Sequence, residues 1–188
     1  MGLFKRESRK ELMAHIDIKT QREEDLLKDL AKLRSERTRY KGKLDVIRDL
    51  LRKYKLVAIE QNKMGKELYV CEIALDKSLS TYLFDFFYRT GNPSYGIEST
   101  ICMDHESYSR YVFIEDIRVQ NINTGEGSIA MEYFLKTAKS LGFIKVVGEL
   151  SPVDNNHFDR LEHFYNKFGF TVTFDENRTS GRIEKRLC

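Results

Sequence analysis

The sequence predicts a mixed α/β (α+β) fold in which a mostly antiparallel sheet with flanking helices follows one long N-terminal helix. Apolar residues recur at alternating spacings of four and three over residues 26–51, whereas apolar and polar residues alternate over much of 56–119. A glycine-containing turn at residues 122–128 then opens a second stretch of helical period. We therefore divide the chain into a basic, coiled-coil-like helical segment, 1–55, and a folded domain, 56–188.

The N-terminal helix carries a heptad seam along one face. Arg37 in the seam, and Gly42 beside it, argue against a long, uninterrupted two-stranded zipper. Gly42 either costs about 1 kcal/mol relative to alanine within one helix or marks a break between two helices. The apolar stripe needs cover from a partner chain or from the domain itself. We expect a homodimer or a protein partner here, through Leu30, Leu33, Leu44 and Ile47; the full seam is Leu26, Leu30, Leu33, Arg37, Tyr40, Leu44, Ile47 and Leu51.

Charge and composition limit the class of protein. Residues 1–55 contain 17 basic and 10 acidic side chains, but these alternate in sign. A nucleic-acid-binding face would instead present an uninterrupted basic stripe, so we expect no nucleic-acid partner. No apolar run approaches the roughly 20 residues that span a bilayer, and the first residues lack the apolar core of a signal peptide. The three cysteines form no disulfide or zinc pattern. These features predict a cytoplasmic protein without a membrane segment or a metal site.

The alternating region and the C-terminal part predict a sheet of about seven strands, with two helices among them. The first helix is expected from Gly127 to Leu141, ending at Gly142, and the second over roughly 156–168, ending at Gly169. The expected strands cover residues 56–60, 68–75, 82–88, 96–103, 111–119 and 144–150, with two short ones at 170–174 and 182–187.

The turn INTGEGS between the strand at 111–119 and the following helix has the features of an anion site. Backbone N–H groups at a helix N-terminus have no intrahelical partner and carry partial positive charge, and glycine allows close approach to that backbone. Glycine is also common at any turn from strand to helix, so the turn alone leaves a purely structural role open.

Four consecutive blocks resemble the GNAT superfamily of acetyl-CoA-dependent N-acetyltransferases. FIEDIRV is similar to the fourth strand of that family, and GEGSIAMEYFLKTAKSLGF to its glycine loop and following helix. IKVVGEL is similar to its fifth strand, and FYNKFGF to the end of its next helix. The resemblance covers residues 111–174, extends to 56–110 by strand pattern only, and is absent from 1–55.

The resemblance implies a sheet that splays apart between these fourth and fifth strands and holds acetyl-CoA, the acetyl donor, without a metal. The pantetheine arm would bond to backbone groups of Ile117 and Val119. The pyrophosphate would lie on backbone amides of the loop, for which the candidates are Asn123, Thr124, Gly125, Glu126, Gly127 and Ser128.

The same resemblance implies two catalytic residues for transfer of acetyl to a primary amine of a small molecule or protein. Glu115 corresponds to the carboxylate that deprotonates the amine, and Tyr165 to the tyrosine that protonates the leaving thiolate. Asp116 would point to the opposite face of a regular strand, unless a bulge intervenes. Alternatively, Glu115 and Asp116 are solvent-facing partners of Arg118, and Tyr165 is an aromatic anchor of its helix.

The loop also departs from the family pattern. Ile122 stands where the family usually has Arg or Gln, and Glu126 places a carboxylate beside the expected pyrophosphate. Unless Glu126 turned to solvent, its charge would repel the phosphates. The alternative function is therefore a catalytically degenerate GNAT-fold binding module that recruits a partner through the N-terminal helix. The acceptor itself is not encoded in a recognisable motif.

Overall fold

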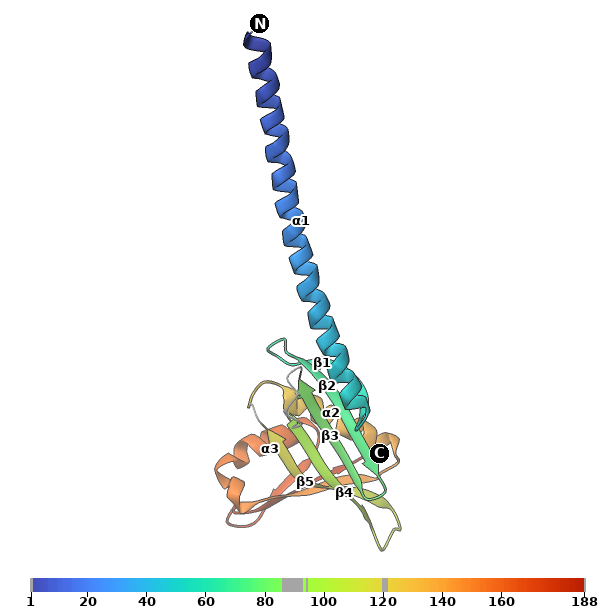
Figure 1. Ribbon diagram of the computed structural model, residues 1–188. Coiled ribbons are helices and arrows are strands. Elements are labelled where there is room, and N and C mark those ends of the chain that lie inside the picture. The colour runs from blue at the N-terminus through green and yellow to red at the C-terminus, as the bar shows by residue number, and fades with distance from the viewer. Residues whose placement is uncertain (1, 86–92, 94, 120–121, 188) are drawn as a thin grey trace. The chain divides into compact units, whose positions relative to one another are not determined.

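The computed structural model describes the backbone of residues 2–85, 93, 95–119 and 122–187 (Figure 1). The chain divides into two compact units, Met1–Asp45 and Val46–Cys188. The first unit is entirely helical where described, and the second contains the sheet and the remaining helices.

Helix α1 (Gly2–Leu51) runs through Gly42 without interruption. Of the two possibilities for Gly42, one continuous helix is therefore the one observed. The seam residues from Leu26 to Leu44 are exposed, but Ile47 is half-buried because it packs beside Val46 and Leu50 in the second unit. Within the first unit, the exposed part of the seam therefore runs from Leu26 to Leu44. In the described part of the chain, no helix is both long enough and apolar enough to cross a membrane.

The described residues form one sheet of eight strands, in the order β1-β2-β3-β4-β5-β6-β8-β7, and each of the eight expected stretches overlaps one of them. All neighbours are antiparallel except β5 and β6, which are parallel and joined through α2 (Glu126–Ser140). Residues 86–88 of the third expected strand lie outside the described part. The strands are β1 (Lys55–Gln61), β2 (Glu67–Leu75), β3 (Ser78–Asp85), β4 (Tyr95–Met103), β5 (Arg110–Val119), β6 (Lys145–Leu150), β7 (Thr171–Phe174) and β8 (Gly181–Arg186).

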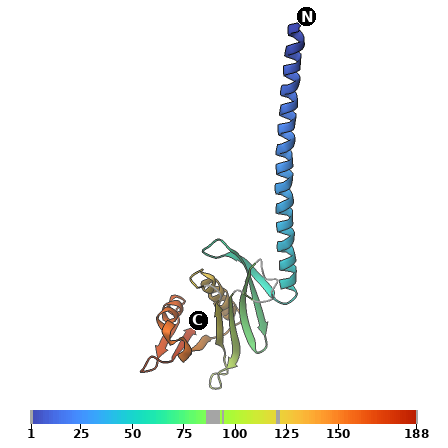
Figure 2. The ribbon, with the colours of Figure 1, turned by 60° about the vertical axis from the view of Figure 1, so that its left-hand side comes forward.

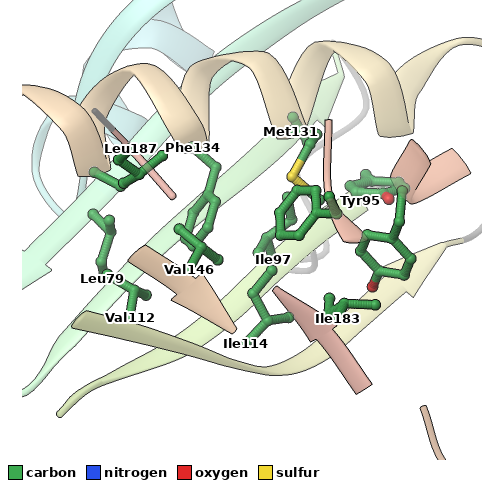
Figure 3. Close-up of a cluster of buried hydrophobic side chains, with 14 of the residues drawn as sticks. Leu79, Tyr95, Ile97, Val112, Ile114, Met131, Phe134, Val146, Ile183 and Leu187 are labelled. Carbon is green, nitrogen blue, oxygen red and sulfur yellow. The ribbon is translucent and has the colours of Figure 1, made fainter. Parts of the chain in front are cut away.

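The main core lies between α2 and one face of the sheet. Met131 and Phe134 of α2 are fully buried and point down onto the sheet, over Ile97 and Val146 (Figure 3). Their spacing of three residues, continued by Ala138, puts them on one helical face, as the period predicts. This packing fixes where α2 begins relative to the ends of β4 and β5.

The opposite face of β2 and β3 has its own smaller core. Val46 and Leu50 at the end of α1 pack there against Tyr69, Cys71 and Phe84. Alternation along β2 explains both layers, because Leu68 and Val70 face α2 whereas Tyr69 and Cys71 face the end of α1. Burial raises the pKa of the Cys71 thiol to about 12, so this cysteine is a protonated core residue.

The C-terminal elements lie beyond β5 in the sheet, orange to red in Figure 2. The helix expected over 156–168 is α3 (Phe158–Lys167), and a 3₁₀ helix, η2 (Pro152–His157), precedes it. Pro152 begins the 3₁₀ turn because it needs no N–H partner there. Arg178 then ties the β7–β8 hairpin to α3 through ion pairs with Asp159 and Glu162.

Candidate active site

The central feature of the site is the separation of β5 from β6. Strand β5 is ten residues long, but β6 pairs with it only over Val112–Ile114. The rest of β5 keeps its ladder with β4 alone, where Ile117 pairs with Ile97 and Val119 with Tyr95. Among the described residues, backbone groups on the β6 side of Ile117 and Val119 therefore have no strand partner. This is the splayed geometry that the family resemblance implied, at the two residues it named.

A β-bulge on β5 begins where the strands separate. Glu98 of β4 pairs with Asp116, but the next residue, Ser99, pairs with Ile114, so Glu115 is the extra residue. A bulge shifts the alternation of side chains by one position. The expectation that Asp116 faces away from Glu115 held only for a regular strand, and β5 is not regular at this point.

Hydrogen bonds show that Glu115 and Asp116 lie on the same face of the sheet. Thr100 donates its hydroxyl proton to Glu115 Oε1, at 2.5 Å. Asp116 pairs with Arg118, which also reaches Glu98, with N···O distances of 3.0 and 3.2 Å. Glu98 and Thr100 are two residues apart on β4 and so share a face. The carboxylate of Asp116 is thus paired with a cation, whereas that of Glu115 accepts a hydrogen bond from a neutral hydroxyl.

A cleft of about 750 Å³ opens at the same place. Its walls come from β5, the end of β6, the start of η2 and the β7–β8 hairpin. Glu115 lines this cleft and Asp116 does not. Two further carboxylates, Glu149 and Asp175, and one cation, Arg182, also line it. Asp175 accepts hydrogen bonds from the N–H and the hydroxyl of Thr179, which lower its pKa. Its carboxylate therefore already has hydrogen-bond partners within the β7–β8 hairpin.

Two residues of the loop before α2 have left-handed backbone conformations. Asn123 and Gly125 both have positive φ, 64° and 87°, and Gly125 is the residue that precedes the helix. Glycine adopts this conformation without strain, which explains its position at the N-cap. The Ser128 N–H donates to Gly125 O at 3.1 Å, so of the predicted donors this one already has a partner within the turn.

Glu126 is buried inside the protein and does not turn to solvent. Its side chain is 1% exposed, and its Oε1 accepts a hydrogen bond of 3.1 Å from Asn62 Nδ2. In the described part of the chain its Oε2 has no hydrogen-bond partner. The carboxylate lies in the first turn of α2, where the helix dipole favours negative charge. Because it points inward, Glu126 leaves the outer side of the loop clear of a negative side chain.

The β1–β2 turn holds the loop from the other side. Asn62 Oδ1 accepts bonds from the N–H groups of Met64 and Lys66, which shapes the turn. The Lys63 N–H donates to Thr124 O at 3.0 Å. The aliphatic part of Lys63 then lies against Gly125, where an added Cβ would be 3.1 Å from Lys63 Cγ.

Two lysines consequently flank the start of α2. Besides Lys63, Lys167 at the end of α3 places its Nζ 2.9 Å from Ser128 Oγ. Both side chains are exposed apart from these contacts. These lysines bring positive charge to the loop. The loop itself has an exposed apolar residue, Ile122, where the family usually has Arg or Gln.

Tyr165 is a buried residue of α3, 5% exposed, that packs edge-to-face with Phe164 and Phe170. Burial raises its pKa well above the usual range, and the charge of Asp154 adds to this effect. Burial also raises the pKa of Tyr95, with contributions from Tyr165 and Glu126. The hydroxyl of Tyr95 lies where a Cβ on Gly127 would stand only 2.8 Å away. Both phenols are therefore protonated at neutral pH.

The structure brings together some of the predicted site residues and leaves others apart. Glu115, Ile117 and Val119 all lie on the separated part of β5. Tyr165 is not among the residues that line the cleft next to Glu115. Sequence reasoning missed four neighbours of the loop, and no sequence motif places them there. They come from the β1–β2 turn, from β4 and from α3: Asn62, Lys63, Tyr95 and Lys167.

The sheet order, the separation of β5 from β6 and the helix that starts between them define the fold of the GNAT acetyltransferases. The GNAT domain of S. lividans PAT has a similar structure, with a TM-score of 0.53 over 69% of this chain and 96% of that domain, at 12% sequence identity. Arabidopsis thaliana NAA60, solved with acetyl-CoA, aligns with a TM-score of 0.49 over 60% of this chain and 78% of that one, at 10% identity.

A relative by sequence is the Bacillus subtilis (strain 168) protein YocC, which is described as uncharacterized. The two are 31% identical over 138 residues, which cover 73% of this chain and 80% of YocC. The chain therefore belongs to the same family as YocC. No protein-family model matches the sequence.

Proposed function

We propose that the protein is an N-acetyltransferase of the cytoplasm that transfers acetyl from acetyl-CoA directly to a primary amine on a small molecule or protein. The observation that carries this proposal is the position of Glu115: an extra residue at a β-bulge, at the point where β5 leaves β6, lining a cleft. A carboxylate there can accept a proton from an amine that enters the cleft.

The residues around the gap fit acetyl-CoA. Backbone groups of Ile117 and Val119 without a β6 partner can bond to the amides of the pantetheine arm. The loop from Asn123 to Gly127 offers amides at a helix N-terminus to the pyrophosphate, and Lys63 and Lys167 add charge on either side. When bound, acetyl-CoA would supply the acetyl group as an activated thioester.

The protein supplies proton transfer and exclusion of competing charges. Glu115 removes a proton from the amine, and Thr100 orients the carboxylate through its hydroxyl. Burial raises the pKa of Tyr165 and so keeps its phenol protonated at neutral pH, and we assign Tyr165 the role of giving a proton to the departing thiolate. Asp116 does not compete for the amine because Arg118 neutralises it.

The cleft favours a cationic acceptor. Glu115 and Glu149 line it and both are exposed to solvent there, with Arg182 as the cation on the same wall. An amine that arrives as an ammonium ion is attracted by these carboxylates before it loses its proton. A primary amine that carries an additional positive group should accordingly be a better acceptor than a neutral one.

Acetyl-CoA is expected to stabilise the protein against unfolding. A ligand at 100 times its Kd stabilises by about 2.7 kcal/mol, which thermal unfolding with and without acetyl-CoA measures. Replacing both Lys63 and Lys167 by methionine should weaken binding by about tenfold and reduce its salt dependence. Lys77→Met, in the exposed β2–β3 turn, is the matched control. No shift at millimolar acetyl-CoA would reject the proposal.

Tyr165→Phe is expected to lower kcat by at least tenfold, with little effect on acetyl-CoA affinity, because the variant keeps the ring packing and loses only the proton donor. Since burial raises the pKa of Tyr165, wild-type turnover should show no decline from loss of this proton below about pH 10. Steady-state kinetics with a validated amine measures both effects. Unchanged turnover in Tyr165→Phe would limit this residue to packing.

One observation favours the second function, a GNAT-fold binding module without catalysis: the cleft beside Glu115 does not include Tyr165. In that case the protein would bind acetyl-CoA, or a partner through the N-terminal helix, without turnover. Acetyl-CoA binding by calorimetry combined with the absence of CoA release across a panel of amines would support the module and reject the enzyme.

A further inference from the structure

The first unit of the chain carries apolar side chains that no described residue of that unit covers. Between Leu26 and Leu44 the seam positions of α1 are 48 to 62% exposed where they are leucine or tyrosine. A helix of this length with an exposed apolar stripe gains stability when the stripe is buried against another helix. The stripe consists of Leu26, Leu30, Leu33, Tyr40 and Leu44.

The charges beside the stripe distinguish between possible partners. In heptad terms, Leu30 and Leu44 occupy position a, and Leu26, Leu33 and Tyr40 occupy position d. The flanking g positions are then Asp29 and Glu36, and the e positions that follow them by five residues are Arg34 and Lys41.

This arrangement is complementary to itself in one orientation. In a parallel, in-register pair, each g residue faces the e residue five positions later on the other helix. Asp29 would face Arg34 of the second copy, and Glu36 would face its Lys41, so that four attractive pairs form across the dimer. Lys43 and Arg48 would form an unfavourable pair at the end of the seam.

An antiparallel pair would be repulsive. There, e positions face e positions, and both Arg34 and Lys41 are basic. The g positions would bring Asp29 and Glu36 together, which is also unfavourable. Arg37 at an a position lowers the affinity in either case, but a single polar residue in the seam is also a known means of selecting a dimer over larger assemblies.

We propose that residues 26–44 form a parallel, two-stranded coiled coil with a second copy of this chain, selected by Asp29–Arg34 and Glu36–Lys41 pairs between the two helices. The proposal is independent of the catalytic function, because it rests on the first unit alone. Acetyl-CoA binding and dimerisation can therefore fail or succeed separately.

The test is a pair of charge reversals in the full-length chain. The wild type should have twice the mass of 22.1 kDa by light scattering or sedimentation at micromolar concentration. Asp29→Arg with Glu36→Lys converts four attractive pairs to repulsive ones and should raise the dimer Kd about 100-fold. Arg34→Glu with Lys41→Glu should do the same. Mixing the two variants should restore a 1:1 dimer, which a misfolded helix could not do.

A separate experiment tests whether the two helices are parallel. Leu44→Cys should form a disulfide between two copies under mild oxidation only in the parallel dimer, where the two positions meet. A monomeric wild type, variants that remain dimeric, or mixed variants that do not combine would each overturn the proposal. If the first unit instead bound nucleic acid, Asp29→Arg with Glu36→Lys would bind it more tightly than the wild type, and the wild type would be monomeric without it.

Discussion

Glu115→Gln is expected to lower kcat by about 10² to 10⁴, the usual contribution of a general base, while acetyl-CoA affinity stays nearly unchanged. The variant keeps a carbonyl oxygen that can accept the Thr100 hydroxyl proton, so the side chain should stay in place. It loses only the ability to take a proton from the amine. Initial rates of CoA release with saturating acetyl-CoA, together with acetyl-CoA binding by calorimetry, measure the two effects separately.

Asp116→Asn provides the matched control for this substitution. The two residues are neighbours on one face of the same bulge, and both are exposed. Asp116, however, is paired with Arg118 and lies outside the cleft. Its loss should change kcat less than threefold, because an exposed ion pair contributes little. Equal effects of the two substitutions would mean that the local charge matters and that Glu115 is not the base.

Asn62→Asp is expected to destabilise the protein by about 3 kcal/mol at neutral pH. The new carboxylate keeps the Oδ atom that accepts the N–H groups of Met64 and Lys66, so the turn is preserved. It loses the N–H donor to Glu126 and sets a second negative charge beside a carboxylate that is 1% exposed. Denaturant unfolding measures the loss.

Glu126→Gln in the Asn62→Asp background should recover most of this stability. The glutamine amide can donate to the aspartate, which restores one hydrogen bond in the reversed direction and removes one of the two charges. A double-mutant cycle gives the coupling directly. Additive effects of the two changes would show that Asn62 and Glu126 do not interact, and would reject the side-chain link between the β1–β2 turn and the first turn of α2.

Local sequence pattern was sufficient for the elements. The heptad spacing from Leu26 onward predicted α1, and glycines after the last apolar positions predicted the ends of α2 and α3 within two residues. Alternation predicted the strands, since successive side chains point to opposite faces; along β2, Leu68 and Val70 join one core whereas Tyr69 and Cys71 join the other. The pattern did not predict the 3₁₀ helix η2, which begins at Pro152, because apolar periodicity does not encode 3₁₀ geometry.

The position of Glu126 could not be predicted in the same way. A carboxylate in the first turn of a helix is usually at the surface, and the expectation here was repulsion toward a phosphate unless the side chain turned outward. The partner that makes an inward position tolerable, Asn62, is 64 residues earlier in the chain. Likewise, Lys63 and Lys167 approach the loop from a hairpin and a helix end that only the folded domain brings together.

By itself, the sequence determined which segments are helical and which are extended. It also determined the GNAT-like order of the last blocks and named Glu115 as a candidate base. These features depend on periods and motifs within short stretches of the chain. Only the tertiary structure decided that β5 separates from β6 after Ile114, that the bulge turns Glu115 and Asp116 to one face, and that Glu126 faces inward. Those features are set by pairing register and by packing between distant elements, for which a single strand or turn carries no local signal.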